Sequence, residues 1–490
     1  MAEYLHGAYG QIQAVGTKTA QKSLNAIVYV GTAPVQTVAG GKDNVNKPIL
    51  VNNIAEARKY FGYSEDWASY TLCEAMHAHL ENNAVGPLVL INVLDPEKHK
   101  AAEKTSTSQK PENGRVVIAN AENAVLDSVT VTGKTLGTDY TIAYDWKKKT
   151  LTIAEVVKGG LGTAALTITY DTVDATSVTE TDVIGASDDA GTNTGLYAVK
   201  NVYQLTETIP SFLLAPGFSE NPKVHAAMLE NSQKVNGHWD VYLLVDLPIA
   251  DSDGKAITLA TAATWKKENG YTEANETVYF PMAEGTDDKH YHLSVLAAAN
   301  LQTLLVEQDG IPYKTASNTE CAIIRNLYLG ESSTGCVYDD ELINNKLNKN
   351  GIASAAYVGG RWVIWGCHSA DYTQDGGDQI NVSETNRMML YYISNDFQHR
   401  RPVNVDKPMT SNDIKTIVAE EQTRLDALLK IGALTYGEVH MNAEADAKSD
   451  IMKGDYTFVF NVTTTPLAKS LTAVVNWTDE GFTTYFADLG

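Results

Sequence analysis

The segment IPSFLLAPGFSENPKVHAAMLENSQKVNGHWDVYLLVDLP, residues 209–248, is the part of the chain that best indicates its fold. It starts with a short apolar run, passes through a loop with proline and glycine, continues with a stretch compatible with a helix, and ends in a second apolar run. Short apolar runs bounded by turn residues are typical of buried strands. A strand, a helix and a strand in succession predict an α/β unit.

The same alternation occurs on both sides of this segment. SLNAIVYVGTAP (23–34) predicts a buried strand, and KPILVNNIAEARKYFG (47–62) predicts a short strand followed by a helix. Asn52 or Asn53 can cap that helix, and Gly62 stands where a helix end favours glycine. Together with similar patterns farther along, this predicts an α/β core that comprises residues 21–110 and 200–400.

The composition changes near residue 111, where the chain becomes rich in threonine and valine with a period of two. In DYTIAYDW, alternate positions are large and apolar and share one face: Tyr140, Ile142, Tyr144 and Trp146. The lysines at 147–149 are expected at a hairpin tip. We therefore predict a small all-β, sandwich-like domain over residues 111–199, inserted into the α/β core as a surface decoration.

Residues 401–478 are predicted to form an α+β C-terminal domain. Its clearest element is a helix over residues 409–434, in which Thr410 and Asp413 have the spacing of a capping box. The apolar positions of this helix form one stripe, interrupted by Glu421: Ile414, Ile417, Val418, Leu425, Leu428 and Leu429.

The two ends of the chain do not carry the pattern of a core. Residues 1–20 are rich in Gly, Ala, Gln and Thr and show no helical periodicity. They are either a frayed tail or an arm that becomes a strand on a partner. Residues 479–490 include GFTTYFADL, which we expect to be an extended C-terminal segment.

Length and composition limit the possible functions. A chain of 490 residues is long enough for roughly two to four domains. Its 38 basic and 60 acidic residues give a net charge of -22, which disfavours direct binding of nucleic acid. The acidity is explained by solubility, or by a need to keep subunits apart until assembly is nucleated.

The sequence shows no pattern typical of cysteine-based sites, secretory signals or membrane helices. The four cysteines form no CxxC pair, so they predict neither a zinc site nor a disulfide framework. The N-terminus lacks the basic and apolar regions of a secretory signal. No apolar run approaches the roughly 18 residues that a membrane helix needs. We therefore expect a protein that is made in, and stays in, a cytoplasm until it is released by another route.

One short segment, GGRWVIWGCHSADY (359–372), has the composition of a catalytic site. A nucleophile, a base and a carboxylate stand close together in Cys367, His368, Ser369 and Asp371. Neighbouring residues of a strand point in opposite directions, so a nucleophile and a base cannot pair there. We interpret the segment as a core strand whose chain turns out of the sheet at Gly366.

Other patterns with chemical potential are also weak. His77 and His79 lie on different faces of a predicted helix, and His290 with His292 lacks a third metal ligand. The acidic loop at 250–256 departs from calcium-loop spacing, and the glycines at 158–163 lack the context of a phosphate-binding loop. We expect a protein that is not an enzyme and has no metal and no cofactor.

Taken in order, several motifs resemble the sheath proteins of contractile phage tails and of related contractile bacteriocins. The resemblance covers most of residues 20–110 and 205–490, and a variable β insertion is compatible with it. The motifs that carry it are KPILVNNIAEARKYFG (47–62), LLAPGFS (213–219), LLVDLP (243–248), INNKLNKNGIASAAYVGGRWVIWGCHSADY (343–372), NVSETNRMMLYYISNDF (381–397), RRPVNVDKP (400–408) and LLKIGAL (428–434). One departure is DGIPYKTASNTECAI (309–323), which replaces a longer proline-rich segment.

The resemblance implies a structural subunit that stacks as hexameric rings around a tail tube and contracts from a metastable extended state to drive the tube through a cell envelope. Extended arms would link neighbouring subunits by adding strands to their C-terminal domains. The implied contact residues of the N-terminal arm are Tyr4, Leu5, Tyr9, Ile12 and Val15. Those of the C-terminal arm are Phe482, Tyr485, Phe486 and Leu489.

The family's C-terminal domain faces the tube. By this resemblance, Lys448, Asp450 and Lys453 in AEADAKSDIMKG are candidates for screened contacts with the tube. The implied partners are other copies of the chain, the tail tube protein, and the baseplate and tail terminator proteins, without direct contact with nucleic acid or membrane. The expected location is a phage virion or a phage-tail-like particle, assembled in the bacterial host cytoplasm.

Two alternatives come from other classes of protein. The acidic, threonine-rich insertion is also compatible with a secreted adhesin or surface-layer protein, which would require a signal peptide. A hydrolase that uses Cys367 or Ser369 with His368 is the second alternative. It predicts covalent labelling by a thiol or serine electrophile that stops on mutation.

Overall fold

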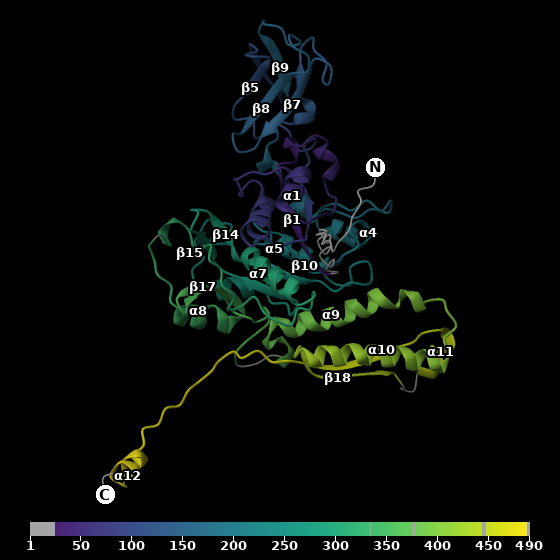
Figure 1. Ribbon diagram of the computed structural model, residues 1–490, viewed down its shortest axis with the longest axis vertical. Coiled ribbons are helices and arrows are strands. Elements are labelled where there is room, and N and C mark those ends of the chain that lie inside the picture. The colour runs from purple at the N-terminus through teal and green to yellow at the C-terminus, as the bar shows by residue number, and fades with distance from the viewer. Residues whose placement is uncertain (1–24, 334, 375–377, 443–446, 488–490) are drawn as a thin grey trace, which may run out of the picture. The chain divides into compact units, whose positions relative to one another are not determined.

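The computed structural model describes residues 25–333, 335–374, 378–442, and 447–487 (Figure 1). The chain divides into two compact units between Lys407 and Pro408. The first unit contains a mixed α/β fold with several sheets, and the second contains a helix packed on a two-stranded sheet.

An eight-stranded sheet forms the centre of the first unit, in the order β17-β16-β12-β11-β10-β1-β3-β2. Only β2 (Ile49–Val51) and β17 (Arg361–Trp365), at the two edges, run antiparallel to their neighbours. The parallel strands are β1 (Asn25–Gly31), β3 (Leu88–Asn92), β10 (Ile209–Leu214), β11 (Tyr242–Asp246), β12 (Glu276–Tyr279) and β16 (Ile352–Val358).

The segment at 209–248 forms the predicted strand, helix and strand. The strands β10 and β11 pair in parallel with Phe212 opposite Tyr242, and α5 (Pro222–Glu230) connects them. The α/β prediction is confirmed here. The other principal helices of the unit are α1 (Ile54–Phe61), α2 (Thr71–Ala75), which continues as a π-helix over Met76–Asn82, α6 (Ala262–Glu268), α7 (Leu293–Glu307), α8 (Asp340–Lys346) and α9 (Glu384–Arg400).

The ends of α1 follow the local sequence signals. Asn53, rather than Asn52, is the N-cap, because its side chain accepts a hydrogen bond from the backbone N–H of Glu56 at 3.0 Å. Gly62 ends the helix with a φ of 72°, a value that glycine adopts without strain. Both capping expectations are confirmed.

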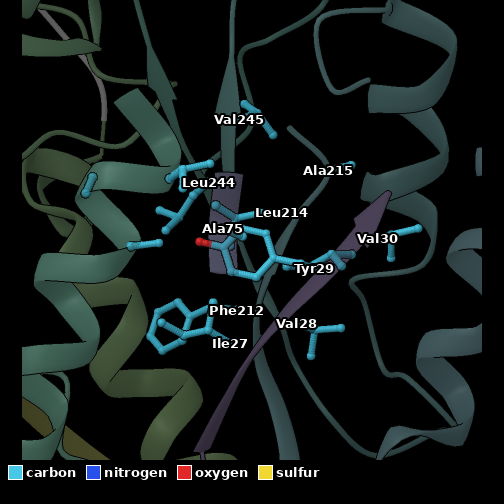
Figure 2. Close-up of a cluster of buried hydrophobic side chains, with 14 of the residues drawn as sticks. Ile27, Val28, Tyr29, Val30, Ala75, Phe212, Leu214, Ala215, Leu244 and Val245 are labelled. Carbon is cyan, nitrogen blue, oxygen red and sulfur yellow. The ribbon is translucent and has the colours of Figure 1, made fainter. Parts of the chain in front are cut away.

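The core of the first unit is built on β1, every residue of which is buried. Tyr29 projects into the cluster of side chains from β10 and β11 (Figure 2). Its hydroxyl lies 2.7 Å from Nε2 of His79. Burial lowers the pKa of His79 to about 3, so the imidazole is neutral and its Nε2 can accept a hydrogen bond from the Tyr29 hydroxyl.

Residues 105–170 contribute a second, separate cluster of buried side chains. Two antiparallel three-stranded sheets enclose it, in the orders β4-β9-β6 and β5-β8-β7. Their strands are β4 (Thr105–Gln109), β5 (Arg115–Ile118), β6 (Thr130–Val131), β7 (Tyr140–Asp145), β8 (Thr150–Glu155) and β9 (Leu166–Tyr170).

Trp146 does not share the environment expected from its alternation with Tyr140. Tyr140 is buried in the second cluster, whereas Trp146 packs against the main core. The Trp146 ring meets Tyr63 edge-on at 4.8 Å, and the Arg58 guanidinium lies over it at 4.5 Å. The alternation of side chains ends at Asp145, the last residue of β7, because a turn begins there. The Trp146 side chain therefore points toward α1.

Candidate assembly site

The second unit begins with α10 (Ser411–Lys430), which has the predicted capping box. The Asp413 N–H donates to the Thr410 hydroxyl at 3.3 Å, and the Thr410 N–H donates to the Asp413 carboxylate at 2.7 Å. The Thr410 hydroxyl also donates to the Asp413 carboxylate at 2.6 Å, and this hydrogen bond, followed by that of the Thr410 N–H, lowers the pKa of Asp413. An ionised cap at this position stabilises the start of the longest helix of the chain.

The apolar stripe of α10 faces the sheet of the same unit. Ile417, Leu425 and Leu428 are buried, and the other three members of the stripe are half-buried. Glu421, which interrupts the stripe in the sequence, is also buried. The helix therefore packs along its whole length through one face, as the spacing of the stripe predicts.

The sheet under α10 has only two strands in the described part of the chain, β18 (Leu434–Met441) and β19 (Phe458–Thr464). They pair antiparallel, with Val439 opposite Phe460. Each strand thus has one edge at which no other described strand lies. An open edge presents backbone N–H and C=O groups in a row, which is a template for a strand from another chain.

The inner face of this sheet is incompletely covered. Val439 is buried, but Phe458, Phe460 and Val462 remain half-buried. One helix on a two-stranded sheet buries little apolar surface, so such a unit is marginal without further strands.

After Thr465 the chain leaves the sheet. The Thr465 N–H donates to the Ala433 carbonyl at 3.2 Å, and its hydroxyl donates to the Gly432 carbonyl at 2.6 Å. Residues 466–478 have no helix or strand and are mostly exposed, and Figure 1 draws them as an extended ribbon that ends in a short helix. Large apolar side chains stand almost fully in solvent there: Leu471 (91% exposed), Val474 (79%), Val475 (90%) and Trp477 (81%).

These four side chains were not among the predicted contact residues, because the predicted C-terminal arm starts at residue 479. A signal was present in SLTAVVNW (470–477). Leu471, Ala473, Val475 and Trp477 alternate along it, as in a strand with one apolar face. We call residues 466–487 the C-terminal tail.

The last described segment is a helix, α12 (Glu480–Ala487), and not the predicted extended segment. Its first turn is held by Thr478, whose hydroxyl accepts the Glu480 N–H at 3.2 Å. Gly481 lies in the first turn of this helix, where capping decides the conformation. Phe482, Tyr485 and Phe486 are all more than half exposed, and Leu489 lies outside the described residues.

Of the remaining predicted contact residues, the structure describes those of α11 but not those of the N-terminal arm. Tyr4, Leu5, Tyr9, Ile12 and Val15 lie outside the described residues. The three tube-contact candidates belong to α11 (Ala447–Lys453), where the Lys453 ammonium lies 3.5 Å from the Asp450 carboxylate. Beside them, Met452 is 81% exposed.

The catalysis-like segment is part of the core, as expected. Val363 and Ile364 are buried, and Gly366 turns the chain with a φ of 124°. The Ser369 hydroxyl lies 2.8 Å from the Asp371 carboxylate and 2.7 Å from the Asn381 carbonyl, both of them acceptors.

His368 is engaged separately from Ser369. Its ring stacks on Tyr372 with centroids 3.6 Å apart, and its Nδ1 contacts the Val382 carbonyl. The Ser369 and His368 side chains thus contact different partners. Their contacts hold the turn that follows β17.

The predicted histidine pairs do not form metal sites in the described structure. His77 pairs with Glu81, whereas His79 contacts Tyr29, so the two point to different faces. His290 stacks on Tyr328, and His292 is held by the carboxylates of Glu74 and Glu220. Over the described ranges, no three His, Cys, Asp or Glu side chains are arranged to hold a metal ion.

None of the helices in the described ranges has the length and apolar character needed to cross a membrane.

Comparison with known proteins identifies the relatives of this chain. No family model matches it. A protein named "Tail sheath protein" from Burkholderia phage BcepMu is 24% identical to it, over 98% of this chain and 98% of that protein.

Two solved structures share its fold. The sheath complex of the PVC extracellular contractile injection system, in the contracted state, has a TM-score of 0.56, with 10% identity over 98% of this chain and 99% of that one. The helical sheath of the anti-feeding prophage, also contracted, has a TM-score of 0.54, with 12% identity over 98% of this chain and 100% of that one. The resemblance found in the sequence motifs is thus confirmed: the chain is a homologue of a phage tail sheath protein and has the fold of contractile sheaths.

Proposed function

We propose that this protein is the structural subunit of a contractile tail sheath, which polymerises as stacked hexameric rings around a tail tube. The observation that carries the proposal is the combination of an open two-stranded sheet with an exposed apolar tail in the same unit. The tail lacks a cover, and the sheet lacks neighbours, within the described part of a single chain. A second copy supplies what each one lacks.

The tail would act as a donated strand. Residues 470–478 are long enough to pair along β18 or β19, which have eight and seven residues. Pairing would satisfy the edge groups and would place Val475 and Trp477 on one face of the enlarged sheet. Because the donor and acceptor surfaces differ, the contact is heterologous and propagates from subunit to subunit instead of closing a dimer.

The domain organisation expected from the sequence is part of this proposal. In the proposal, residues 21–110 and 200–400 form the rigid core, residues 111–199 are an inserted β domain on the outside, and residues 401–478 with the arms form the tube-side lattice. Contraction from a metastable extended lattice would move the cores as rigid bodies while the arms keep them connected. Such a transition needs no nucleotide.

The direct test of assembly is electron microscopy of the purified full-length chain, alone and with a tail tube protein. Hollow ribbed cylinders with sixfold symmetry are expected, and the tube should lie inside them when it is present. Monomers or small closed oligomers at all concentrations would contradict the proposal.

The tube contact can be tested through the charges of α11. Replacing Lys448 and Lys453 with glutamate should reduce co-assembly with the tube several-fold at low salt, because the proposed contacts are electrostatic. Co-sedimentation of sheath and tube measures the effect, which should weaken as salt is raised. Lys415→Glu, at an exposed residue of α10, is the control for charge reversal outside α11. Full-length tails at unchanged yield from the double variant would show that these lysines do not hold the tube.

The partners in this proposal are other copies of the chain, the tube, the baseplate and the tail terminator. Assembly would take place in the cytoplasm of a bacterial host, and the product would be a phage tail or a phage-tail-like particle.

A further inference from the structure

A buried histidine lies at the carboxyl edge of the central sheet, beside the point where the strand order reverses. From β1 the chain continues toward β3 on one side, and from β10 it continues to β11 on the other. In open α/β sheets this point forms the crevice in which ligands bind. Here a side chain on Gly217, just after β10, would come within 3.9 Å of Cε1 of His292 and 3.2 Å of Thr71. His292 therefore lies in this region.

Two carboxylates from different elements hold the His292 ring. Its Nδ1 lies 2.7 Å from the Glu74 carboxylate of α2, which also accepts the His292 backbone N–H at 2.6 Å. Its Nε2 lies 3.4 Å from the carboxylate of Glu220, in the loop between β10 and α5. The His292 side chain is 11% exposed and that of Glu74 is 1% exposed. Both ring nitrogens must carry protons for both carboxylates to be paired.

Other titratable groups close to His292 or to the carboxylates that hold it include Asp246, Tyr29, Tyr271 and Tyr291. Asp246, at the end of β11, accepts a hydrogen bond from the Ser294 N–H at 3.0 Å and another from the Ser294 hydroxyl. The Asp246 N–H donates in turn to the Ser219 hydroxyl, in the same loop as Glu220, at 3.3 Å. Tyr29 of β1 is close enough to feel the charges of Glu74 and Asp246.

We propose that His292 is a proton-dependent clamp that fastens the loop at residues 215–221 to α2 and α7. With both nitrogens protonated, the imidazolium bridges Glu74 and Glu220. When Nε2 loses its proton, its lone pair faces the Glu220 carboxylate, and the attraction becomes repulsion. The bond from Nδ1 to Glu74 persists in the neutral ring. The loop is thus released on one side while α2 and α7 stay connected.

The electrostatics give the direction of the pH dependence. Burial disfavours the imidazolium, but the Glu74 charge, the hydrogen bonds to both carboxylates and the Glu220 charge together hold the pKa of His292 well above its ordinary value. Burial raises the pKa of Asp246 to about 7, partly offset by the His292 charge. Both groups bind protons more tightly in the folded state. Their contribution to stability is complete at low pH and is lost as pH rises, through about 7 for Asp246 and above that for His292.

The test follows the apparent melting temperature of the full chain from pH 5.5 to 9.5, together with amide hydrogen exchange of residues 215–221. We expect the melting temperature to fall with pH and the loop amides to lose protection, after correction for intrinsic exchange, while the His292 amide stays protected. His292→Gln should flatten the loop-protection profile and remove the fall of the melting temperature above pH 7, leaving the part that comes from Asp246. His290→Gln, an exposed residue two positions away, is the matched control and should follow the unchanged protein.

A second measurement does not depend on the folding of the His292 variant. Histidine Cε1 resonances in the unchanged protein should include one that titrates well above the ordinary range near 6.5. Glu220→Gln should lower that midpoint by removing one of the two carboxylates. The proposal is overturned if loop protection does not change with pH, or if the His292 resonance titrates in the ordinary range.

Discussion

Placing charges on the apolar face of the C-terminal tail should abolish polymerisation without affecting the fold. In the double variant Val475→Asp, Trp477→Asp, we expect monomers where the unchanged chain forms cylinders. The two side chains are 90% and 81% exposed in the single chain, so their replacement removes little that the subunit itself needs. Burying each of them on a neighbour contributes about 2 kcal/mol.

The loss at each contact is therefore about 4 kcal/mol, which raises the critical concentration roughly a thousandfold. Sedimentation velocity gives the critical concentration, and the apparent melting temperature should stay unchanged. Asn476→Asp adds a charge at the intervening position and serves as the matched control, because its side chain points to the other face of a strand. Cylinders of normal length from the double variant would mean that the tail does not link the subunits.

The second large effect is expected at Gly366, where the chain leaves β17. Its φ of 124° is open to glycine and strained for other residues. A Cβ there would lie 2.6 Å from Nδ2 of Asn348 and 2.9 Å from Cα of Ala353. Asn348 is already committed, because the same amide donates to the carbonyls of Ile352 and Trp365 at 3.0 Å each.

Gly366→Ala should therefore destabilise the core by roughly 3 kcal/mol or more, the sum of backbone strain and overpacking. The matched control is Gly359→Ala in the β16–β17 turn. Gly359 also has a positive φ, 62°, but a Cβ there meets nothing within 4 Å. The control should cost about 1–2 kcal/mol. Equal decreases in the apparent melting temperature for the two variants would show that the close packing around Gly366 adds nothing to the destabilisation.

The local signals of the sequence were sufficient for much of the fold. The alternation at 209–248 predicted β10, α5 and β11, and single residues such as Asn53 and Thr410 predicted helix ends. These features depend on hydrogen bonds and periodicities that span only a few residues. The stripe of α10 is readable for the same reason, since it reflects the geometry of one helix.

Local sequence signals did not predict every part of the candidate site. The arm predicted from the sequence starts at 479, and the alternation from Leu471 to Trp477 precedes it. Whether such a stretch pairs within its own chain is decided by the strands available to it. The helix at α12 was missed because a short segment with Gly481 and three aromatic residues fits an extended and a helical conformation about equally, and capping by Thr478 tips the balance.

The sequence by itself determined the α/β class, the capped helices, and the resemblance to contractile sheath proteins, because short-range periodicity and the order of motifs are properties of the chain alone. Only the tertiary structure decided that Trp146 packs against Arg58 and that His292 stands between Glu74 and Glu220. His292 is 218 positions from Glu74 in the chain. No local pattern encodes a contact over that distance, because the packing of helices on the central sheet creates it.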